Sequence, residues 1–436
     1  MNRIIIIGNG FDLAHNLKTG YKDFINDYWA VVEEKVYGRY WQWLDQHYGG
    51  TKHTLDNYED KFVCIEKEYG KTESNKVCFS YKEDCLFGKL CTLIDGYNND
   101  PNTSVTVHLK FKNRFFERIS HQCSLVNWVD IENEYYDALK KLSLEENAQE
   151  RSQKVKKLNI EFEAIKNLLE KYLYGISKSS VTQHASIIES VNSLIELNDV
   201  ALKKQQQYLD SILKDIDQSG NEMEVFGRVM AEPDPFCSTA ETYRMHLKNK
   251  LESDHFKKKY CIPTQIVFLN FNYTNTAQKL YLDEENDNEI INIHGELYNK
   301  ANPMIFGYGD ELDNTYKKIE ELQDNDFLEN IKSINYHETR NYRRLLEFIE
   351  SGIYQVFIMG HSCGNSDRTL LNTLFEHDNC ASIKVYYWQQ ENGSDNYSDL
   401  IRNISRNFND KPKMRDIVVN RENCSPLVPM EKEVAE

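Results

Sequence analysis

Short apolar runs alternate with helical patterns at both ends of the chain. The first run, Ile4–Ile7, is β-branched throughout and ends at Gly8, which predicts a strand buried on both faces. Four further runs come after residue 260, at 266–269, 290–293, 356–359 and 383–387. Helical patterns lie between most of them, near 275–282, 339–350 and 367–377. Buried strands that alternate with helices predict an α/β fold with a doubly wound, mainly parallel sheet.

The middle of the chain is patterned differently. From Phe24 to Leu44, apolar residues recur with the period of an amphipathic helix. Residues 70–104 are interrupted by Gly, Asn and Pro, so we expect loops, and residues 105–111 alternate like an edge strand or an extended segment. From about 130 to 217, long helical stripes predict antiparallel helices that also suit coiled-coil pairing.

These patterns predict two structural units. Residues 1–25 and 260–425 form one discontinuous α/β domain, and residues 26–259 form a large, mostly helical insertion into it. We expect the helical lobe to dock a partner, either a second copy of the chain or another protein.

Composition and charge disfavour several classes of protein. The 69 acidic residues exceed the 52 Lys and Arg residues, and the net charge of −17 disfavours binding to nucleic acid. The first apolar run is too short for a signal peptide, and no stretch reaches the ~20 apolar residues of a membrane helix. The ten cysteines contain no C-x-x-C pair, so we expect free thiols, no metal site and a cytoplasmic protein.

Polar and glycine residues follow four of the predicted strands, at the point where each strand ends. They read Gly8-Asn9-Gly10-Phe11-Asp12, Asn270-Phe271-Asn272-Tyr273-Thr274, His294-Gly295-Glu296 and Gly360-His361-Ser362, the last continuing to Ser366-Asp367. Ligands of doubly wound sheets bind at the carboxyl ends of the strands. We therefore expect these residues to meet in one site.

The first of these loops has two interpretations. Gly8-Asn9-Gly10 lets the backbone come close to a ligand and present its N–H groups, and the same residues suit a tight turn from strand to helix. Because Leu13 stands where the G-x-G-x-x-G fingerprint needs its third Gly, a standard dehydrogenase is disfavoured.

Two side chains at later strand ends have the chemistry of an active site. His294 lies between a strand and Gly295, where an imidazole that titrates near neutrality is placed to act as a general base. Asn272 is suited to hold a sugar hydroxyl or a water molecule. Their alternatives are a structural histidine and an Asx-type cap for the helix near residue 275.

The loop after the fourth strand is also open to two interpretations. His361 and Ser362 either contact a ligand or turn the chain, and Ser366-Asp367 also suits a helix N-cap. Asp130 and Glu132 either complement a helix dipole or reach a ligand. No G-x-S-x-G elbow is present, which disfavours a Ser-His-Asp hydrolase.

Several of these segments together resemble the bacteriophage abortive-infection AbiH family. The matching segments follow the family's order over roughly residues 1–380: Ile4 to Gly10, Phe11-Asp12-Leu13-Ala14-His15, Thr19-Gly20-Tyr21-Lys22-Asp23-Phe24, Trp128-Val129-Asp130-Ile131-Glu132, Phe271-Asn272-Tyr273-Thr274, Ile293-His294-Gly295, and Gly360-His361-Ser362 through Asp367-Arg368. The resemblance implies a bacterial antiviral defence protein that responds to an unidentified phage trigger.

This pattern in turn resembles the Rossmann-like NAD-binding domain of sirtuins. The resemblance implies that residues 8–12 form the loop beside the dinucleotide, and that Asn272 and His294 match catalytic residues. The chain departs from the sirtuin loop at Asn9 and Asp12, where sirtuins have Ala and Ser. The paired-cysteine zinc module of sirtuins is absent from the sequence, so the resemblance does not extend to protein deacylation.

The resemblance implies an effector that binds NAD and hydrolyses its N-glycosidic bond without a metal. In that hypothesis His294 is the general base, Asn272 orients water or the ribose, and Asp12 binds the ribose or stabilises charge. The residues that line the dinucleotide are then Gly8, Asn9, Gly10, Phe11, Gly360, His361, Ser362 and Asp367. Two alternatives stay open: a non-catalytic nucleotide sensor that docks a partner, and an enzyme that attacks nucleic acid.

Overall fold

The computed structural model describes residues 1–37, 55–70, 85–99, 101, 104–126, 130–218, 240–282 and 288–430. The helix predicted from Phe24 to Leu44 is described as far as Tyr37, and the remainder of that prediction lies outside the described residues. The segment Trp128-Val129 also lies outside them.

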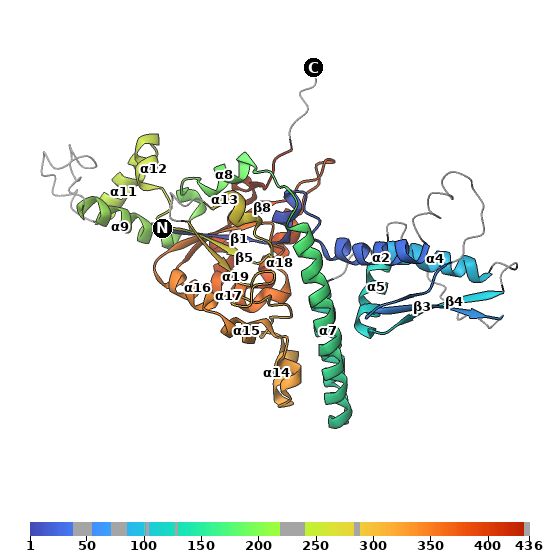
Figure 1. The fold of residues 1–436 in the computed structure, drawn as a ribbon. Coiled ribbons are helices and arrows are strands. Elements are labelled where there is room, and N and C mark those ends of the chain that lie inside the picture. The colour runs from blue at the N-terminus through green and yellow to red at the C-terminus, as the bar shows by residue number, and fades with distance from the viewer. Residues whose placement is uncertain are drawn as a thin grey trace, which may run out of the picture.

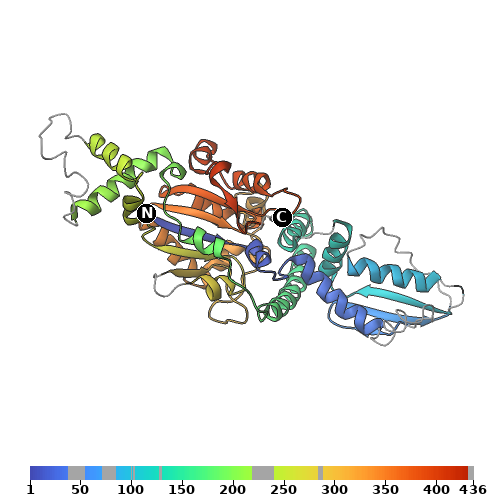
Figure 2. The ribbon, with the colours of Figure 1, turned by 90° about the horizontal axis from the view of Figure 1, so that it is seen from above.

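A six-stranded sheet forms the centre of the molecule (Figures 1 and 2). Its strands are β1 (Asn2–Ile7), β5 (Ile266–Asn270), β6 (Glu289–Asn292), β7 (Tyr354–Met359), β8 (Cys380–Tyr387) and β9 (Ser425–Pro426). They lie in the order β6-β5-β1-β7-β8-β9, and every neighbouring pair is parallel. The predicted doubly wound, parallel sheet is confirmed, and β9 extends it by a short strand that the sequence did not predict.

Helices cover both faces of the sheet, which explains why the strands read as continuous apolar runs. Ile4 and Ile6 pack on one face and Ile5 and Ile7 on the other, and all four are fully buried. The first face is covered by α16 (Asn341–Glu350), α17 (Arg368–Glu376) and α18 (Tyr397–Arg406). The second is covered by α1 (Asn9–Ala14), α8 (Ala185–Val191) and α13 (Thr276–Tyr281). α19 (Lys411–Ile417) packs beside β8.

The chain between α1 and β5 forms two parts that lie on opposite sides of the sheet (Figures 1 and 2). The first part contains a three-stranded antiparallel sheet of β2 (Tyr58–Glu59), β3 (Val63–Tyr69) and β4 (Val105–Phe111). Its helices are α2 (Tyr21–Tyr37), α4 (Leu86–Asn99), α5 (Arg114–Val126), α6 (Ile131–Ser143) and the long α7 (Ala148–Ile176). One hydrophobic core, centred on Trp29, Phe116 and Phe162, joins them.

The region of the small sheet confirms one prediction of the sequence analysis and corrects another. Residues 105–111 are indeed an edge strand, paired to β3 along one side only. The loops expected between 70 and 104 are wrong where α4 runs, because Phe87, Leu90 and Ile94 form a buried helical stripe. The Gly and Asn residues within and around this stripe gave the sequence the pattern of a loop.

The second part consists of α9 (Leu202–Gln218), α11 (Ala240–Lys250) and α12 (Asp254–Tyr260). A separate core of Tyr208, Ile212, Leu247 and Phe256 holds it together. The long connection from β6 to α16 adds α14 (Asn314–Glu321) and α15 (Lys332–Asn335).

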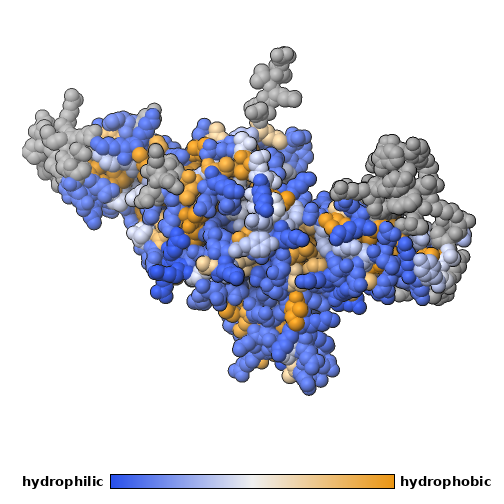
Figure 3. Space-filling model, viewed as in Figure 1, coloured by the Kyte–Doolittle hydropathy of each residue, from blue (hydrophilic) through white to orange (hydrophobic). Residues whose placement is uncertain are grey.

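The visible surface is mostly hydrophilic. In Figure 3 hydrophilic residues cover most of this face, most completely over α14 and the adjoining end of α7. Among the helices that the structure describes, none is long and apolar enough to cross a membrane.

Candidate functional site

The order of the strands fixes where a ligand site is expected. The chain runs from β1 outward through β5 and β6 on one side, and then through β7, β8 and β9 on the other. Numbered by their place in the chain, the parallel strands have the order 3-2-1-4-5-6, which reverses between β1 and β7. The predicted loops after β1 and β7 lie at this reversal, where doubly wound folds bind dinucleotides.

These two loops are in direct backbone contact. The Gly10 N–H donates to Gly360 O at 2.8 Å, and a Cβ on Gly8 would stand 2.4 Å from the Cα of His361. Gly360 has a φ of +77°, and a Cβ there would stand 2.0 Å from the N atom of Phe11. The glycines therefore serve the close packing of one loop on the other. In this structure the space next to them is filled by protein.

The remaining residues of the first loop are also held by the protein. Asn9 accepts a hydrogen bond from the Thr19 hydroxyl, and the two oxygens lie 2.5 Å apart. Phe11 is fully buried and packs against His15 and Tyr281 in the core below the loop. Asn9 lies beside the predicted ligand position, whereas Phe11 is a core residue in this structure.

Asp12 is a buried carboxylate with one unsatisfied oxygen. Its Oδ2 accepts from the Thr274 hydroxyl at 2.5 Å, so the loops after β1 and β5 are joined here. Its Oδ1 is buried and has no hydrogen-bond partner among the described residues. Burial raises the pKa of Asp12 to about 6, against the opposing effect of the Thr274 hydrogen bond. Such an acceptor is suited to a ligand hydroxyl or a water molecule.

Asn272 and its neighbour Asn270 organise the loop after β5. The Asn272 side-chain amide donates to Gly8 O at 3.0 Å, and its backbone N–H donates to the Asn270 side chain at 3.1 Å. Asn270 in turn donates to Asn292 at the end of β6. Asn272 is not a helix cap, since α13 begins after Asn275. It ties the ends of β1 and β5 together beside the site.

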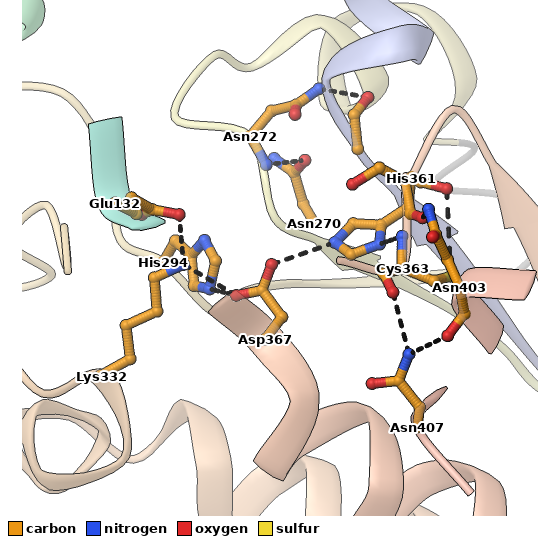
Figure 4. A network of polar contacts seen from close by, with 12 residues as sticks. Glu132, Asn270, Asn272, His294, Lys332, His361, Cys363, Asp367, Asn403 and Asn407 are labelled. Atoms are coloured by element: carbon orange, nitrogen blue, oxygen red, sulfur yellow. Dashed lines mark hydrogen bonds and ion pairs between the residues drawn. The ribbon is translucent and has the colours of Figure 1, made fainter. Parts of the chain in front are cut away.

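Asp367 lies at the centre of a buried polar cluster (Figure 4). Its Oδ1 accepts from the Lys332 ammonium at 2.8 Å and from His294 Nε2 at 3.2 Å. Its Oδ2 faces His361 Nε2 at 3.5 Å. Asp367 is the N-cap residue of α17, but its side chain makes no capping hydrogen bond and faces the ion partners instead. We call Asp367, His294, His361, Lys332 and Glu132 the ion cluster.

The two histidines of the ion cluster are held in defined orientations. His361 Nδ1 accepts from the backbone N–H of Cys363 at 3.0 Å, so its proton is on Nε2, toward Asp367. His294 Nε2 is 3.3 Å from the Tyr336 hydroxyl and faces the same carboxylate, so Nδ1 is the ring nitrogen left to accept a proton. The geometry distinguishes a locked His361 from a His294 that retains a basic nitrogen.

Burial and charge set the protonation of the ion cluster. Burial opposes ionisation of Asp367, but Lys332 and His294 hold its pKa well below the ordinary value. Burial, followed by the nearby Lys332 charge, lowers the pKa of His294 to about 4. Burial raises the pKa of Glu132 to about 7 although Lys332 opposes the shift. The histidine is therefore neutral at pH 7, beside an ionised carboxylate.

Lys332 and Glu132 were not predicted as site residues. Lys332 also donates to Glu132 Oε2 at 2.9 Å, and Glu132 Oε1 accepts from the Gly307 N–H at 3.4 Å. Glu132 lies in the first turn of α6, where a carboxylate suits the helix dipole, and it also pairs with Lys332. Asp130 is the N-cap of α6 and accepts from the Asn133 N–H. No local signal in the sequence marks Lys332.

A hollow of about 710 Å³ lies at the neighbouring strand end, lined by Tyr387, Asn420, Arg421, Glu422 and Cys424. Because Met359 pairs with Tyr386, Tyr387 is level with Gly360 on the next strand. The Arg421 guanidinium carbon stands 5.2 Å from the centre of the Tyr397 ring. Ser362 follows β7, the strand next to β8. It is exposed, and its carbonyl accepts a hydrogen bond from the Asn403 side chain.

Comparison with known proteins identifies the family. The family model described as "Bacteriophage abortive infection AbiH" matches residues 4–126 and 98–388. The chain belongs to the AbiH family. Membership assigns it to bacteriophage abortive infection, and the matched residues include every strand end of the candidate site. Comparisons with curated proteins and with solved structures found no match.

Proposed function

We propose that this AbiH protein is an antiphage effector that binds a nicotinamide dinucleotide and hydrolyses its N-glycosidic bond. The observation that carries the proposal is the ion cluster at the carboxyl edge of a sheet with strand order 3-2-1-4-5-6. That strand order is the one in which dinucleotides bind across the reversal point.

The residues present fit such a ligand. Asp12 offers a buried acceptor oxygen without a partner, which suits a ribose hydroxyl. The hollow at the end of β8 supplies the Tyr387 ring and the Arg421 guanidinium for the other end of the molecule. Gly8 and Gly10 contact the β7 loop, so they would reach a pyrophosphate only through their backbone and only after the two loops separate.

The charge of the site suits the reaction. Cleavage of a nicotinamide N-glycosidic bond places positive charge on the ribose as the bond breaks. Asp367 is ionised and balances the ammonium of Lys332, and Glu132, with a pKa of about 7, is partly ionised at pH 7. The small excess of negative charge stabilises a cation, because the fields of fixed charges are weakly screened in a buried site.

His294 supplies the proton acceptor in this proposal. Its Nε2–H faces Asp367, which fixes the ring and leaves Nδ1 to take up a proton from water. Asn272 holds the Gly8 loop in place through its amide, and so acts on the site by positioning. His361, locked between Cys363 and Asp367, has the same positioning role.

Both histidines of the ion cluster are buried. His294 is 4 % exposed and His361 is 5 % exposed, so a substrate reaches them only after the covering segments move. A closed site agrees with an effector whose activity toward its own cell must be restrained before infection.

The test combines binding with turnover. Isothermal titration with NAD measures binding, and release of nicotinamide measures cleavage, each before and after addition of a phage lysate. His294→Gln keeps a hydrogen-bonding side chain without a proton acceptor, and we expect it to bind NAD while turnover falls about 10²- to 10⁴-fold. His377→Gln, at the exposed His377–Glu350 pair, is the matched control and keeps full turnover.

The outcomes separate the candidate functions. A folded His294→Gln protein that cleaves NAD at the wild-type rate and still protects cells would show that His294 is structural. NAD binding without turnover in the wild-type protein, with and without lysate, supports the nucleotide-sensor alternative. Degradation of RNA or DNA with NAD untouched supports the nucleic-acid alternative.

A further inference from the structure

The ammonium of Lys332 occupies a position that the proposed function leaves unassigned. Its side chain is 1 % exposed, and Nζ lies between Glu132 Oε2 at 2.9 Å and Asp367 Oδ1 at 2.8 Å. The two carboxylates come from distant parts of the chain, one from the insertion helix α6 and one from the loop after β7. A single buried charge therefore joins the insertion to the catalytic edge of the sheet.

The backbone around Lys332 is shaped to bring it there. The Lys332 N–H donates to Tyr308 O at 2.9 Å, and the Tyr308 N–H donates to Asn330 O at 3.1 Å. A Cβ on Gly309 would stand 2.9 Å from Ser366 O and 3.3 Å from Lys332 Cβ, so a larger residue would separate Lys332 from Asp367. The segment around 307–309 thus holds the ammonium against the carboxylate by direct contact.

We infer that Lys332 is a positioning residue of the site, which holds Asp367 against the two imidazoles and lowers the basicity of His294. As a role in catalysis this inference rests on the proposed function. As a statement about the protonation of His294 it is tested without any turnover.

Several charged and titratable groups face the ion cluster. They are Lys332 on α15, Glu132 and Asp130 on α6, Asp367 and His361 after β7, and the hydroxyls of Tyr21, Tyr273 and Tyr336. Lys332 carries the positive charge among them. Its removal leaves Asp367 uncompensated, which favours a proton on His294. Glu132 is protonated where His294 titrates, so its removal has little effect on His294.

Histidine titration by NMR measures this directly. Protein labelled with ¹³C at histidine is titrated from pH 3.5 to 8, and the signals of His294 and His361 are assigned with the His294→Gln and His361→Gln proteins. The variants are Lys332→Met, Glu132→Gln and the pair of both. Lys384→Met, which breaks the Lys384–Asp199 pair at 2.9 Å on β8, is the matched control.

The lysine and glutamate substitutions are expected to differ. We expect the wild-type His294 midpoint near pH 4, where Glu132, with a pKa of about 7, is protonated. Lys332→Met raises the midpoint by about one pH unit, Glu132→Gln leaves it nearly unchanged, and the paired substitution shows the same rise as Lys332→Met. Lys384→Met leaves it unchanged. In the nicotinamide-release assay, Lys332→Met moves the acid limb of the pH profile upward by the same amount.

Two comparisons decide the outcome. If Lys332→Met does not fold, the paired substitution replaces the ion pair by two neutral side chains. Its comparison with Glu132→Gln alone still isolates the effect of the lysine charge. Equal His294 midpoints in those two proteins would overturn the inference. If the wild-type protein cleaves no NAD while the midpoints shift as expected, the proposed function fails and the positioning role of Lys332 stands.

Discussion

Replacement of Asp367 by Asn tests the centre of the ion cluster. The substitution keeps the size of the side chain and removes its charge. It leaves the buried Lys332 ammonium with Glu132 as its only carboxylate, and it removes the acceptor that fixes both His294 and His361.

The size of the effect follows from burial. Breaking a buried ion pair typically costs about 3–5 kcal/mol, because the remaining charge loses its partner in a medium of low polarity. Glu132 still pairs with Lys332 at 2.9 Å, so we expect the lower end of that range, about 3 kcal/mol. For a chain of 436 residues that corresponds to a decrease in Tm of about 3 °C.

The pH dependence gives a second check. The pKa of Asp367 lies well below its ordinary value in the folded protein. Its contribution to stability is therefore fully present above the unfolded pKa of about 3.9, and it is lost as the pH falls toward the folded value. The difference between wild type and Asp367→Asn should be constant from pH 7 to pH 5 and shrink below about pH 4.

The assay is thermal unfolding followed by circular dichroism at pH 7, 5 and 3.5. Asp378→Asn is the control, because Asp378 is fully exposed and 3.8 Å from Lys413, and its loss should leave Tm unchanged. A Tm at pH 7 within 2 °C of wild type, or a difference that grows on acidification, would refute the reasoning.

Two further predictions concern the first loop and its neighbour. Gly360→Ala should lower Tm by much more than Gly393→Ala: both residues have positive φ, but a Cβ at Gly360 meets the Phe11 N atom at 2.0 Å whereas none is met within 4 Å at Gly393. Asp12→Asn should remove a pH dependence. Because burial raises the pKa of Asp12 to about 6, the stability of the wild-type protein relative to the Asn protein should fall by about 3 kcal/mol as the pH rises from 4 to 8. Thermal unfolding measures the glycine variants, and denaturant unfolding across that pH range measures the Asp12 pair.

The sheet was predictable because its signal is local. Ile4–Ile7 and Val356–Met359 are buried on both faces, so each strand reads as an unbroken apolar run. The small antiparallel sheet was only partly predictable. Strand β3 changes from the buried Val63 and Ile65 to charged residues within one strand, so its pattern is short and mixed.

The site was predictable as a set of strand ends and not as a set of partners. The loops of His294, His361 and Asp367 follow from where parallel strands stop. The pairing of Asp367 with Lys332 does not follow from the strand ends. Lys332 lies in a four-residue helix, and its other partner, Glu132, is 200 positions away from it in the chain. The sequence also suggested an N-cap at Asp367, because a carboxylate before an apolar helical stripe suits a cap equally well as a buried ion pair.

The ion cluster is difficult to explain by stability alone. Replacing a buried ion pair by apolar residues of similar volume is often neutral or stabilising, so a chain that needed only a firm joint between insertion and sheet had a simpler solution. Here one ammonium, two carboxylates and two imidazoles are buried together at the reversal of the strand order. Departures from simple core packing tend to occur at functional sites, where they are offset by stability elsewhere in the fold. The insertion, through Glu132, therefore completes the edge of the sheet chemically as well as covering it.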